Sequence, residues 1–298
     1  MRKVHASQAE LGACPHREEK KRLGDWQSQP KPYFIRGKAV HYGREFALST
    51  YLKHGELPSL GAVTEKAVGD VEAAEGEIDD REPWRRESTE EELTEGIDSA
   101  LPLIAGDYAL ALPTIAPHVE AVESFGELEL EGFAAMLVGS CDIRGRDPMT
   151  KSATILDLKT SAKNPGTAAQ TKADTSQQLT MYAVIFREAF GEMPTHCLDY
   201  LWPGKRKPKA DPDIAVHEFK DTQPGGVKFV MRRVVTTSRS AADIDAGLRR
   251  LRVKLDAIKH GWYPPAPTTG ITSPCSDCYH RANPDASQRC EYNPDIRR

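Results

Sequence analysis

The chain has 298 residues, of which 39% are hydrophobic and 28% are charged, and its mean hydropathy is −0.54. Such a composition is typical of a globular protein with a buried core, built as one elaborated α/β domain or as about two domain equivalents. No apolar run of about 18 residues is evident, so we expect no membrane-spanning segment and no membrane partner. The basic start at residues 1–8 is not followed by the apolar stretch of a secretory signal, so we expect a cytoplasmic protein.

The charges are unevenly distributed along the chain, although the formal net charge is only −4 and the isoelectric point is about 6.2. Acidic residues dominate positions 56–98, whereas basic residues gather after position 200. The later basic residues are Lys205, Arg206, Lys207, Lys209, Arg232, Arg233, Arg249, Arg250, Arg252 and Lys254. A local basic surface of this kind can bind nucleic acid, but a run of charges is as often a solvated face, so both interpretations stay open.

Helical signals come first along the chain. Apolar residues recur at helical spacing over 37–52, which places His41 and Glu45 one turn apart on a neighbouring face. Residues 55–80 are acidic, rich in Gly and Ala and weakly periodic, so we expect a mobile insertion there. The spacing Ser88-Thr-Glu-Glu91 is that of a capping box and predicts a short, peripheral helix.

Extended character follows between His118 and Leu158, where short apolar or alternating runs are separated by glycines and predict an antiparallel meander. The pattern over 178–190 then suits an amphipathic helix ended by Gly191. Further expected elements are strands at 196–202 and 227–235 and a helix capped by Ser240, with apolar residues on one stripe over 244–258. This order of elements predicts a mixed α/β core with helices packed on a sheet.

The candidate chemistry begins with two carboxylates and a lysine. Asp157 and Lys159 lie two apart at the end of a strand-type run, so both side chains are expected on one face of the strand. Asp142 follows the preceding strand, fifteen positions earlier, and a turn between the two strands lets the carboxylates converge. With the backbone carbonyl of Leu158 they form a hard oxygen site suited to Mg²⁺ or Mn²⁺. The alternative is a surface salt bridge and an unrelated turn aspartate.

This set of groups predicts phosphodiester hydrolysis. The metal would hold and acidify a water, and Lys159 would orient that water or offset the charge that develops on phosphorus. Gln178 and Tyr182 lie four apart on one helix face, where the glutamine can bind a phosphate or the water and the tyrosine can pack on a sugar or base. His41 can supply a nitrogen ligand, although a lone helical histidine is more often structural.

Four motifs in order now resemble a known family: Gly37-Lys-Ala-Val-His41, Gly139-Ser-Cys-Asp142, Asp157-Leu-Lys159 and Gln178-Leu-Thr-Met-Tyr182. Together they look like the PD-(D/E)XK nuclease superfamily in its RecB-like exonuclease branch. The resemblance implies a restriction-endonuclease-like core in which His41, Asp142 and Asp157 bind the catalytic metal, Lys159 is catalytic, and Gln178 and Tyr182 belong to the helix that contacts DNA. Glu123 resembles a further acidic position of the family.

Four of the six cysteines suggest a second metal site. Cys275 and Cys278 have the two-residue spacing that lets two thiolates share a metal or cluster, and eleven residues separate Cys278 from Cys290. Cys14, followed by a proline, resembles the N-terminal cysteine of the iron-sulfur exonucleases of this branch, the CRISPR-associated and AddB-type nucleases. That resemblance implies a [4Fe-4S] cluster that joins the two chain ends. The wide spacing before Cys290 departs from the family pattern.

Two alternatives therefore stay open at these four cysteines. One is Zn²⁺ with His280 as a substitute ligand, and the other is that the thiols are unligated. Cys141 and Cys197 lie within strand-type runs and are interpreted as small core residues.

The expected organisation has four parts: 1–54 with the first cluster ligand and core helix, 55–117 as an acidic, partly helical insertion, 118–260 as the nuclease core, and 261–298 as the C-terminal cysteine segment. The resemblance implies a metal-dependent DNA exonuclease acting on single strands or ends, in recombination, repair or phage DNA processing, with a recombination or helicase protein as a further partner. The alternatives are an inactive DNA-binding or scaffold protein and an endonuclease of the same superfamily. Phosphate contacts are expected from Lys205, Arg206, Lys207, Arg249 and Arg250.

Overall fold

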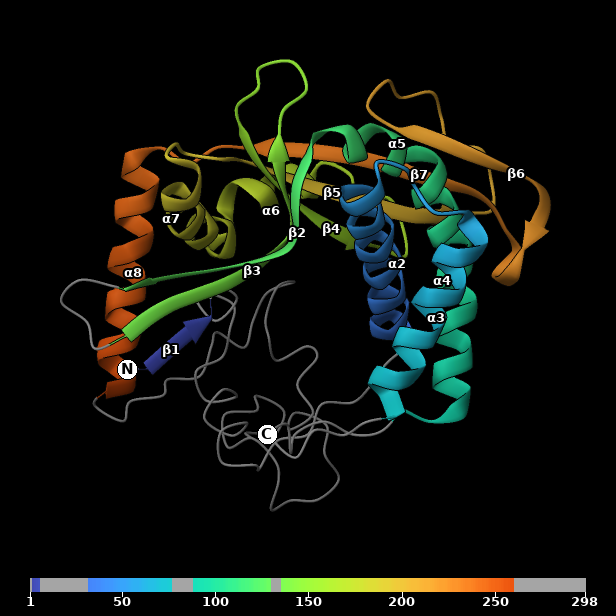
Figure 1. Cartoon of the computed structure of the whole chain (residues 1–298), viewed down its shortest axis with the longest axis horizontal. Coiled ribbons are helices and arrows are strands. Elements are labelled where there is room, and N and C mark those ends of the chain that lie inside the picture. The colour runs from blue at the N-terminus through green and yellow to red at the C-terminus, as the bar shows by residue number, and fades with distance from the viewer. Residues whose placement is uncertain (1, 6–31, 77–87, 130–134, 260–298) are drawn as a thin grey trace, which may run out of the picture.

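The computed structural model of the chain describes residues 2–5, 32–76, 88–129 and 135–259. Within this part, one curved sheet separates two groups of helices (Figure 1). The sheet has seven strands: β1 (Arg2–His5), β2 (Val119–Glu129), β3 (Ala135–Arg146), β4 (Ala153–Thr160), β5 (Thr195–Gly204), β6 (Ala215–Gln223) and β7 (Val227–Thr237). Their order is β1-β3-β4-β5-β7-β6, and β2 lies outside this order and pairs with β3.

The sheet is mixed, as predicted. Strands β2, β3 and β4 form the expected antiparallel meander, and β5, β7 and β6 are also antiparallel neighbours. The pairs β1–β3 and β4–β5 are parallel. A parallel pair needs a crossover connection, which here passes through α6 (Ala168–Thr175) and α7 (Gln177–Phe190). The parallel pairing places Lys159 and the end of β5 at the same edge of the sheet.

Each face of the sheet carries its own core. On one face α6, α7 and α8 (Ala241–Lys259) pack against side chains of β3, β4, β5 and β7. On the other face lie α2 (Pro32–His54), α3 (Leu60–Gly76) and α4 (Glu90–Leu110), followed by the short α5 (Leu112–Ile115) and the 3-10 turn η2 (Ala116–His118). Alternate residues of each strand therefore point toward different helices, which decides where the site can form.

The expectation of a mobile insertion at 55–80 is wrong. Most of this stretch is α3, and its residues Val63, Ala67 and Val71 are fully buried against α2 and α4. The periodicity is hard to recognise in the sequence because the buried stripe is made largely of alanine and valine. Burial against neighbouring helices supplies the stabilisation that an isolated helix of this length lacks.

The helix expected after Ser88 is also longer and more central than predicted. Its capping box is formed by Thr89 and Glu92, one position later than expected, and the helix runs for 21 residues through Pro102. By length and hydropathy alone, residues 90–118 would suffice to cross a membrane, contrary to the expectation from sequence. Half of that apolar window is buried inside the structure, where α4 packs against α2 and the sheet, so its hydrophobicity has a structural explanation.

The helices α7 and α8 agree closely with the predictions. The helix α7 is capped by Ser176, whose hydroxyl accepts from the amide of Leu179, and it ends at Gly191 in the left-handed conformation. At the start of α8, the hydroxyl of Ser240 accepts from the amide of Asp243. The short elements β1, β6 and α6 were not predicted, because four to nine residues carry too little periodicity.

Candidate metal centre

The candidate site forms where the β3–β4 ladder ends. The last paired rung joins Ile143 to Leu156, and the two strands then diverge. Cys141 packs in the core beside α7, whereas Ile143 packs in the core beside α2, so the strand alternation breaks at Asp142 between them. This irregularity frees Asp142 from the regular ladder. Its Oδ2 accepts a hydrogen bond of 2.7 Å from the backbone N–H of Leu158, which lies beyond the last β3–β4 rung.

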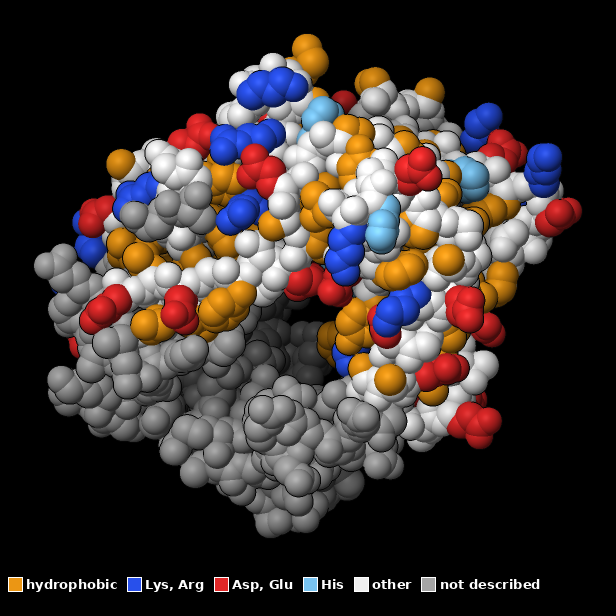
Figure 2. All heavy atoms as spheres, in the orientation of Figure 1, with side chains coloured by type: hydrophobic (Ala, Val, Ile, Leu, Met, Phe, Trp, Pro, Cys, Tyr) orange, Lys and Arg blue, Asp and Glu red, His pale blue; other side chains and the backbone are white. Residues whose placement is uncertain are grey.

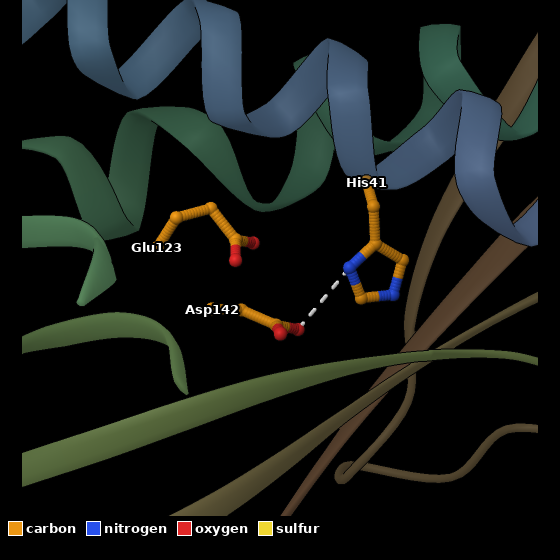
Figure 3. A group of neighbouring side chains, drawn as sticks. All are labelled: His41, Glu123 and Asp142. Atoms are coloured by element: carbon orange, nitrogen blue, oxygen red, sulfur yellow. Dashed lines mark ion pairs between the residues drawn. The ribbon is translucent and has the colours of Figure 1, made fainter. Parts of the chain in front are cut away.

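The neighbouring strand β2 is distorted at the same rung. Its pairing with β3 places Glu123 opposite Asp142, and Glu123 has a φ of 46°, in the left-handed region that a non-glycine residue rarely adopts. Backbone strain of this kind costs of the order of 1–3 kcal/mol and persists where the surrounding structure enforces it. The result is that two carboxylates on adjacent strands face the same space (Figure 3).

His41 on α2 completes this group from above the sheet. Its Nδ1 lies 3.3 Å from Asp142 Oδ2, and its Nε2 lies 3.1 Å from the carbonyl oxygen of Leu158. Because a carbonyl oxygen can only accept, Nε2 carries the proton in that contact. In a neutral ring, Nδ1 then presents its lone pair to the carboxylate of Asp142. A proton or a cation between Nδ1 of His41 and Oδ2 of Asp142 would stabilise this arrangement, because both atoms are electron-rich.

The geometry fits a small divalent cation. His41, Glu123 and Asp142 each offer one ligand atom, and these atoms all lie within 4.8 Å of one another. An octahedral shell with metal–ligand bonds of about 2.1 Å separates neighbouring ligand atoms by about 3.0 Å and opposite ones by about 4.2 Å. The 3.3 Å between His41 Nδ1 and Asp142 Oδ2 is close to the first value, while the 4.8 Å limit of the whole group is somewhat wider than the second, so small side-chain shifts would bring all three atoms to one ion. Oxygen with imidazole nitrogen is a donor set that Mg²⁺ or Mn²⁺ accepts.

Asp157 and Lys159 lie on β4 next to this group, with both side chains on the face of the sheet that α7 covers. Asp157 is buried and forms an ion pair with Lys159. Burial opposes the charge of Lys159, but Asp157 and Asp142 outweigh that effect and raise the pKa of the lysine above its usual value. Lys159 is therefore a cation. Asp157 is not within the 4.8 Å group, so the structure brings His41 and Asp142 together as predicted and adds Glu123 in preference to Asp157.

The clustered carboxylates oppose each other's ionisation. Loss of solvent around its carboxylate and the charge of Asp142 raise the pKa of Glu123 to about 7, although the residue as a whole is exposed. Burial and the charge of Asp157 likewise raise the pKa of Asp142, against the opposing effects of His41 and Lys159. A site that disfavours its own negative charge in this way is one that a bound cation would stabilise.

The predicted pair on α7 lies at the edge of the site. Gln178 Nε2 donates to the hydroxyl of Tyr182 at 2.8 Å. Tyr182 is only 5% exposed and packs edge-to-face against Phe186, so its ring belongs to the core and has little surface for stacking on a base. Of the predicted role of Tyr182 at the nucleic acid, only hydrogen bonding by its hydroxyl remains available, because the ring is buried. Burial and the charges of Asp157 and Asp142 raise the pKa of that hydroxyl, which keeps it protonated.

The basic residues after position 200 divide into two kinds. Lys205, Arg206 and Lys207 are exposed in the loop after β5, and Arg249 and Arg250 are exposed on α8, where Arg249 pairs with Asp245. Arg232 and Arg233, in contrast, are largely buried and form ion pairs with Asp199 and Asp211, so their role is structural. On the face shown in Figure 2, Lys and Arg side chains are spread over several elements among acidic ones.

One polar cluster was missed by the sequence analysis. Arg44 of α2 is buried together with Asp107 of α4 and Asp199 of β5, and Arg232 pairs with the same Asp199. A signal for it exists in the sequence, because Asp107 and Asp199 each interrupt an otherwise apolar run. The cysteines predicted as cluster ligands, Cys14, Cys275, Cys278 and Cys290, lie outside the described residues, as does His280. Cys141 and Cys197 are buried core residues, as expected.

Comparison with known proteins identifies the family of the chain. The profile of the PD-(D/E)XK nuclease superfamily matches residues 13–283, and the chain therefore belongs to that superfamily. Among solved structures, the chain is similar to a candidate exonuclease from Eubacterium rectale, with 12% identity over 88% of this chain and 83% of that chain and a TM-score of 0.44. The solved structure of SSO0001 shows 14% identity over 98% of this chain and 87% of that chain, with a TM-score of 0.38. No curated protein matches.

Proposed function

We propose that this nuclease is a divalent-metal-dependent DNA exonuclease of the RecB-like branch, acting on single strands or ends. The observation that supports it most strongly is the convergence of His41, Glu123 and Asp142 within 4.8 Å, beside the Asp157–Lys159 pair. Residues from α2, β2, β3 and β4 meet there, at strand irregularities that a purely structural role does not require.

The proposed metal ligands are His41, Asp142 and Asp157, with Glu123 as a further candidate because its carboxylate lies within 4.8 Å of the ligand atoms of His41 and Asp142. The carbonyl of Leu158, also expected as a ligand, accepts from His41 Nε2 and would reach a metal bound at Nδ1 only after that contact breaks. A bound Mg²⁺ or Mn²⁺ would supply a Lewis acid for the phosphate and would lower the pKa of a bound water. The Nε2–H of His41 holds the Leu158 carbonyl in place, and the Leu158 N–H holds Asp142. In this way the backbone of β4 orients two of the proposed ligands at once.

Lys159 has the position and the charge for the chemical step. The oxygen of water forms a bond to phosphorus while the ester P–O bond breaks, and the leaving oxygen takes up a proton. The ammonium of Lys159, a cation held next to Asp157, orients that water and stabilises the charge that builds on the phosphoryl oxygens. The hydroxyl of Tyr182, oriented by Gln178, provides a donor at the edge of the same site.

DNA contacts and the cysteines complete the proposal. The exposed residues Lys205, Arg206, Lys207, Arg249 and Arg250 would contact phosphates. The four cysteines would hold a [4Fe-4S] cluster, with Zn²⁺ as the alternative, and a recombination or helicase protein would be the partner. Metal analysis and a visible spectrum after anaerobic purification test the cluster, which Cys275→Ala should abolish together with much of the stability. A variant that keeps full absorbance would contradict the assignment.

The central experiment is digestion of end-labelled linear DNA and of circular DNA with Mg²⁺ or Mn²⁺. Asp142→Asn and Lys159→Met should each lower the rate at least about 100-fold. Asp221→Asn and Lys163→Met are matched controls, since both residues are exposed and lie outside the site. Cleavage of circular DNA would identify an endonuclease. If the wild type and both site variants are equally inactive, the protein is a DNA-binding or scaffold protein with the same fold.

A further inference from the structure

The buried polar cluster around Arg44 connects α2 to the rest of the molecule. Arg44 is 3% exposed, its Nε donates to Asp107 Oδ2 at 3.0 Å, and a second guanidinium nitrogen contacts the other oxygen of the same carboxylate. Its NH1 lies 2.9 Å from Asp199 Oδ2. Arg232 of β7 donates to the second oxygen of Asp199 at 2.8 Å, so two cations and two anions balance.

This cluster meets the candidate site at one rung of the sheet. Asp199 on β5 is paired with Leu158 on β4. Leu158 is the residue whose carbonyl contacts His41 and whose N–H donates to Asp142. Thus His41 and Arg44, three positions apart on α2, contact neighbouring strands at the same rung.

The spacing of the two contacts matches the geometry of the elements. Three residues of an α-helix rise about 4.5 Å, and paired strands lie about 4.8 Å apart. In Figure 1, α2 runs steeply across the strands. His41 contacts Leu158 of β4, and Arg44, three residues later, contacts Asp199 of β5. A helix held at two points one turn apart cannot slide or rotate without breaking one of the contacts.

The other contacts of α2 give weaker control of its position relative to the sheet, because the ion pair of Lys38 with Glu75 links α2 to α3 and not to a strand. The buried face of α2 toward α3 and α4 includes the small residues Ala39, Gly43 and Ala47. Apolar contacts of this kind are not directional and tolerate small shifts. A buried ion pair adds little net stability over an apolar replacement, but the bidentate contact of Arg44 with Asp107, together with its ion pair to Asp199, restricts the orientation of the guanidinium.

We infer that Arg44 is a positioning residue that, through Asp199 and Asp107, sets the height and rotation of α2 so that His41 lies against Leu158 and Asp142. This inference rests on the proposed metal site, because the function of His41 is that of a ligand there. Arg44 itself is buried and is not one of the proposed metal ligands. Its loss should therefore weaken metal binding through His41, by about tenfold, as is usual for groups that orient a ligand.

The test compares Arg44→Lys with Arg232→Lys. Both variants keep the positive charge and lose the fork, and both disturb Asp199, but only Arg44 lies on α2. The dissociation constant for Mn²⁺ is measured from the signal of free Mn²⁺ in electron paramagnetic resonance, after urea unfolding has confirmed a cooperative fold. We expect about tenfold weaker binding for Arg44→Lys and a change of less than twofold for Arg232→Lys. Should Arg44→Lys fail to fold, Asp107→Asn replaces it with the same expected direction.

A double-mutant cycle with His41→Ala separates positioning from general loosening. If Arg44 acts through His41, the effect of Arg44→Lys on Mn²⁺ binding disappears in the His41→Ala background. An equal effect in both backgrounds, equal weakening by the two lysine variants, or no weakening by Arg44→Lys would each overturn the inference.

A separate measurement keeps this inference distinct from the proposed function. The ring nitrogen signals of His41 in the metal-free protein report its contact with the Leu158 carbonyl. Arg44→Lys should shift them, and Arg232→Lys should not. A wild type that binds no Mn²⁺ would refute the proposed metal site, whereas unshifted His41 signals in Arg44→Lys would refute the positioning role.

Discussion

A buried histidine outside the candidate metal centre allows a quantitative prediction about pH. His196 on β5 is 0% exposed, and neither ring nitrogen has a hydrogen-bond partner. Burial, together with the nearby charge of Arg239, lowers its pKa from 6.5 to about 3. The imidazole is therefore neutral in the folded protein throughout the ordinary pH range, while in the unfolded chain it takes up a proton below pH 6.5.

The sign of the effect follows from which state binds the proton. Below pH 6.5 the unfolded chain binds one proton more than the folded protein at this position, so stability falls as the pH falls. At pH 5, 1.5 pH units below the unfolded value and well above the folded one, the loss amounts to about 2 kcal/mol relative to pH 7. A loss of this size is a substantial part of the stability of a typical domain.

Replacement of the imidazole by a similar apolar side chain should remove this loss. We expect His196→Leu to be at least as stable as the wild type at pH 7, since it removes two unsatisfied buried nitrogens. Between pH 7 and pH 5, urea unfolding should show a decrease that is about 2 kcal/mol smaller for His196→Leu than for the wild type. His54→Gln, at an exposed position on the last turn of α2, serves as the control and should follow the wild type. Equal decreases in wild type and His196→Leu would refute the reasoning.

Three further predictions concern the site, the packing of α4 and DNA binding. Because the folded pKa of Glu123 is about 7, above its unfolded value, its contribution to stability is present at pH 4.5 and is lost as the pH rises through 7. In EDTA at pH 8, Glu123→Gln should therefore be more stable than the wild type by about 1 kcal/mol, a figure reduced for solvent exposure. Thermal melts should show that the variant loses this advantage at pH 4.5. Gly106→Ala should destabilise by about 1–3 kcal/mol in urea unfolding, because its Cβ would lie 2.3 Å from Val230 Cγ1, whereas Gly69→Ala, with nothing within 4 Å, should stabilise by about 0.5–1 kcal/mol. Replacing the three basic residues at 205–207 by Ala should weaken binding of single-stranded DNA and flatten its dependence on salt in fluorescence anisotropy, and an unchanged slope would place the phosphate contacts elsewhere.

Local periodicity alone was sufficient for several elements. The helix α7 and its glycine end, the capped start of α8 and the β2–β3–β4 meander were predicted because their signals lie within a few consecutive residues. The shared face of Asp157 and Lys159 is of the same kind, since alternation along a strand fixes it. The profile match then confirmed the family that the ordered motifs had indicated.

Helices whose stability comes from their neighbours were harder to predict. The segment that forms α3 has weak periodicity of its own and is held by burial of small side chains against α2 and α4. The apolar character of α4 is ambiguous in the sequence, where a buried helix and a membrane span have the same composition. Only the packing of α4 between α2 and the sheet distinguishes the two.

The sequence by itself determined the type of chemistry: which residues are available, in which order, and on which local elements they lie. The tertiary structure alone decided how they meet, because the contacts that build the site join residues far apart in the chain. The left-handed backbone at Glu123 brings its carboxylate to Asp142, and the Arg44–Asp199 contact aligns α2 with the rung that His41 reaches. Such contacts depend on strand register and helix placement, which arise from the packing of the whole core and leave no periodic signal in any single segment.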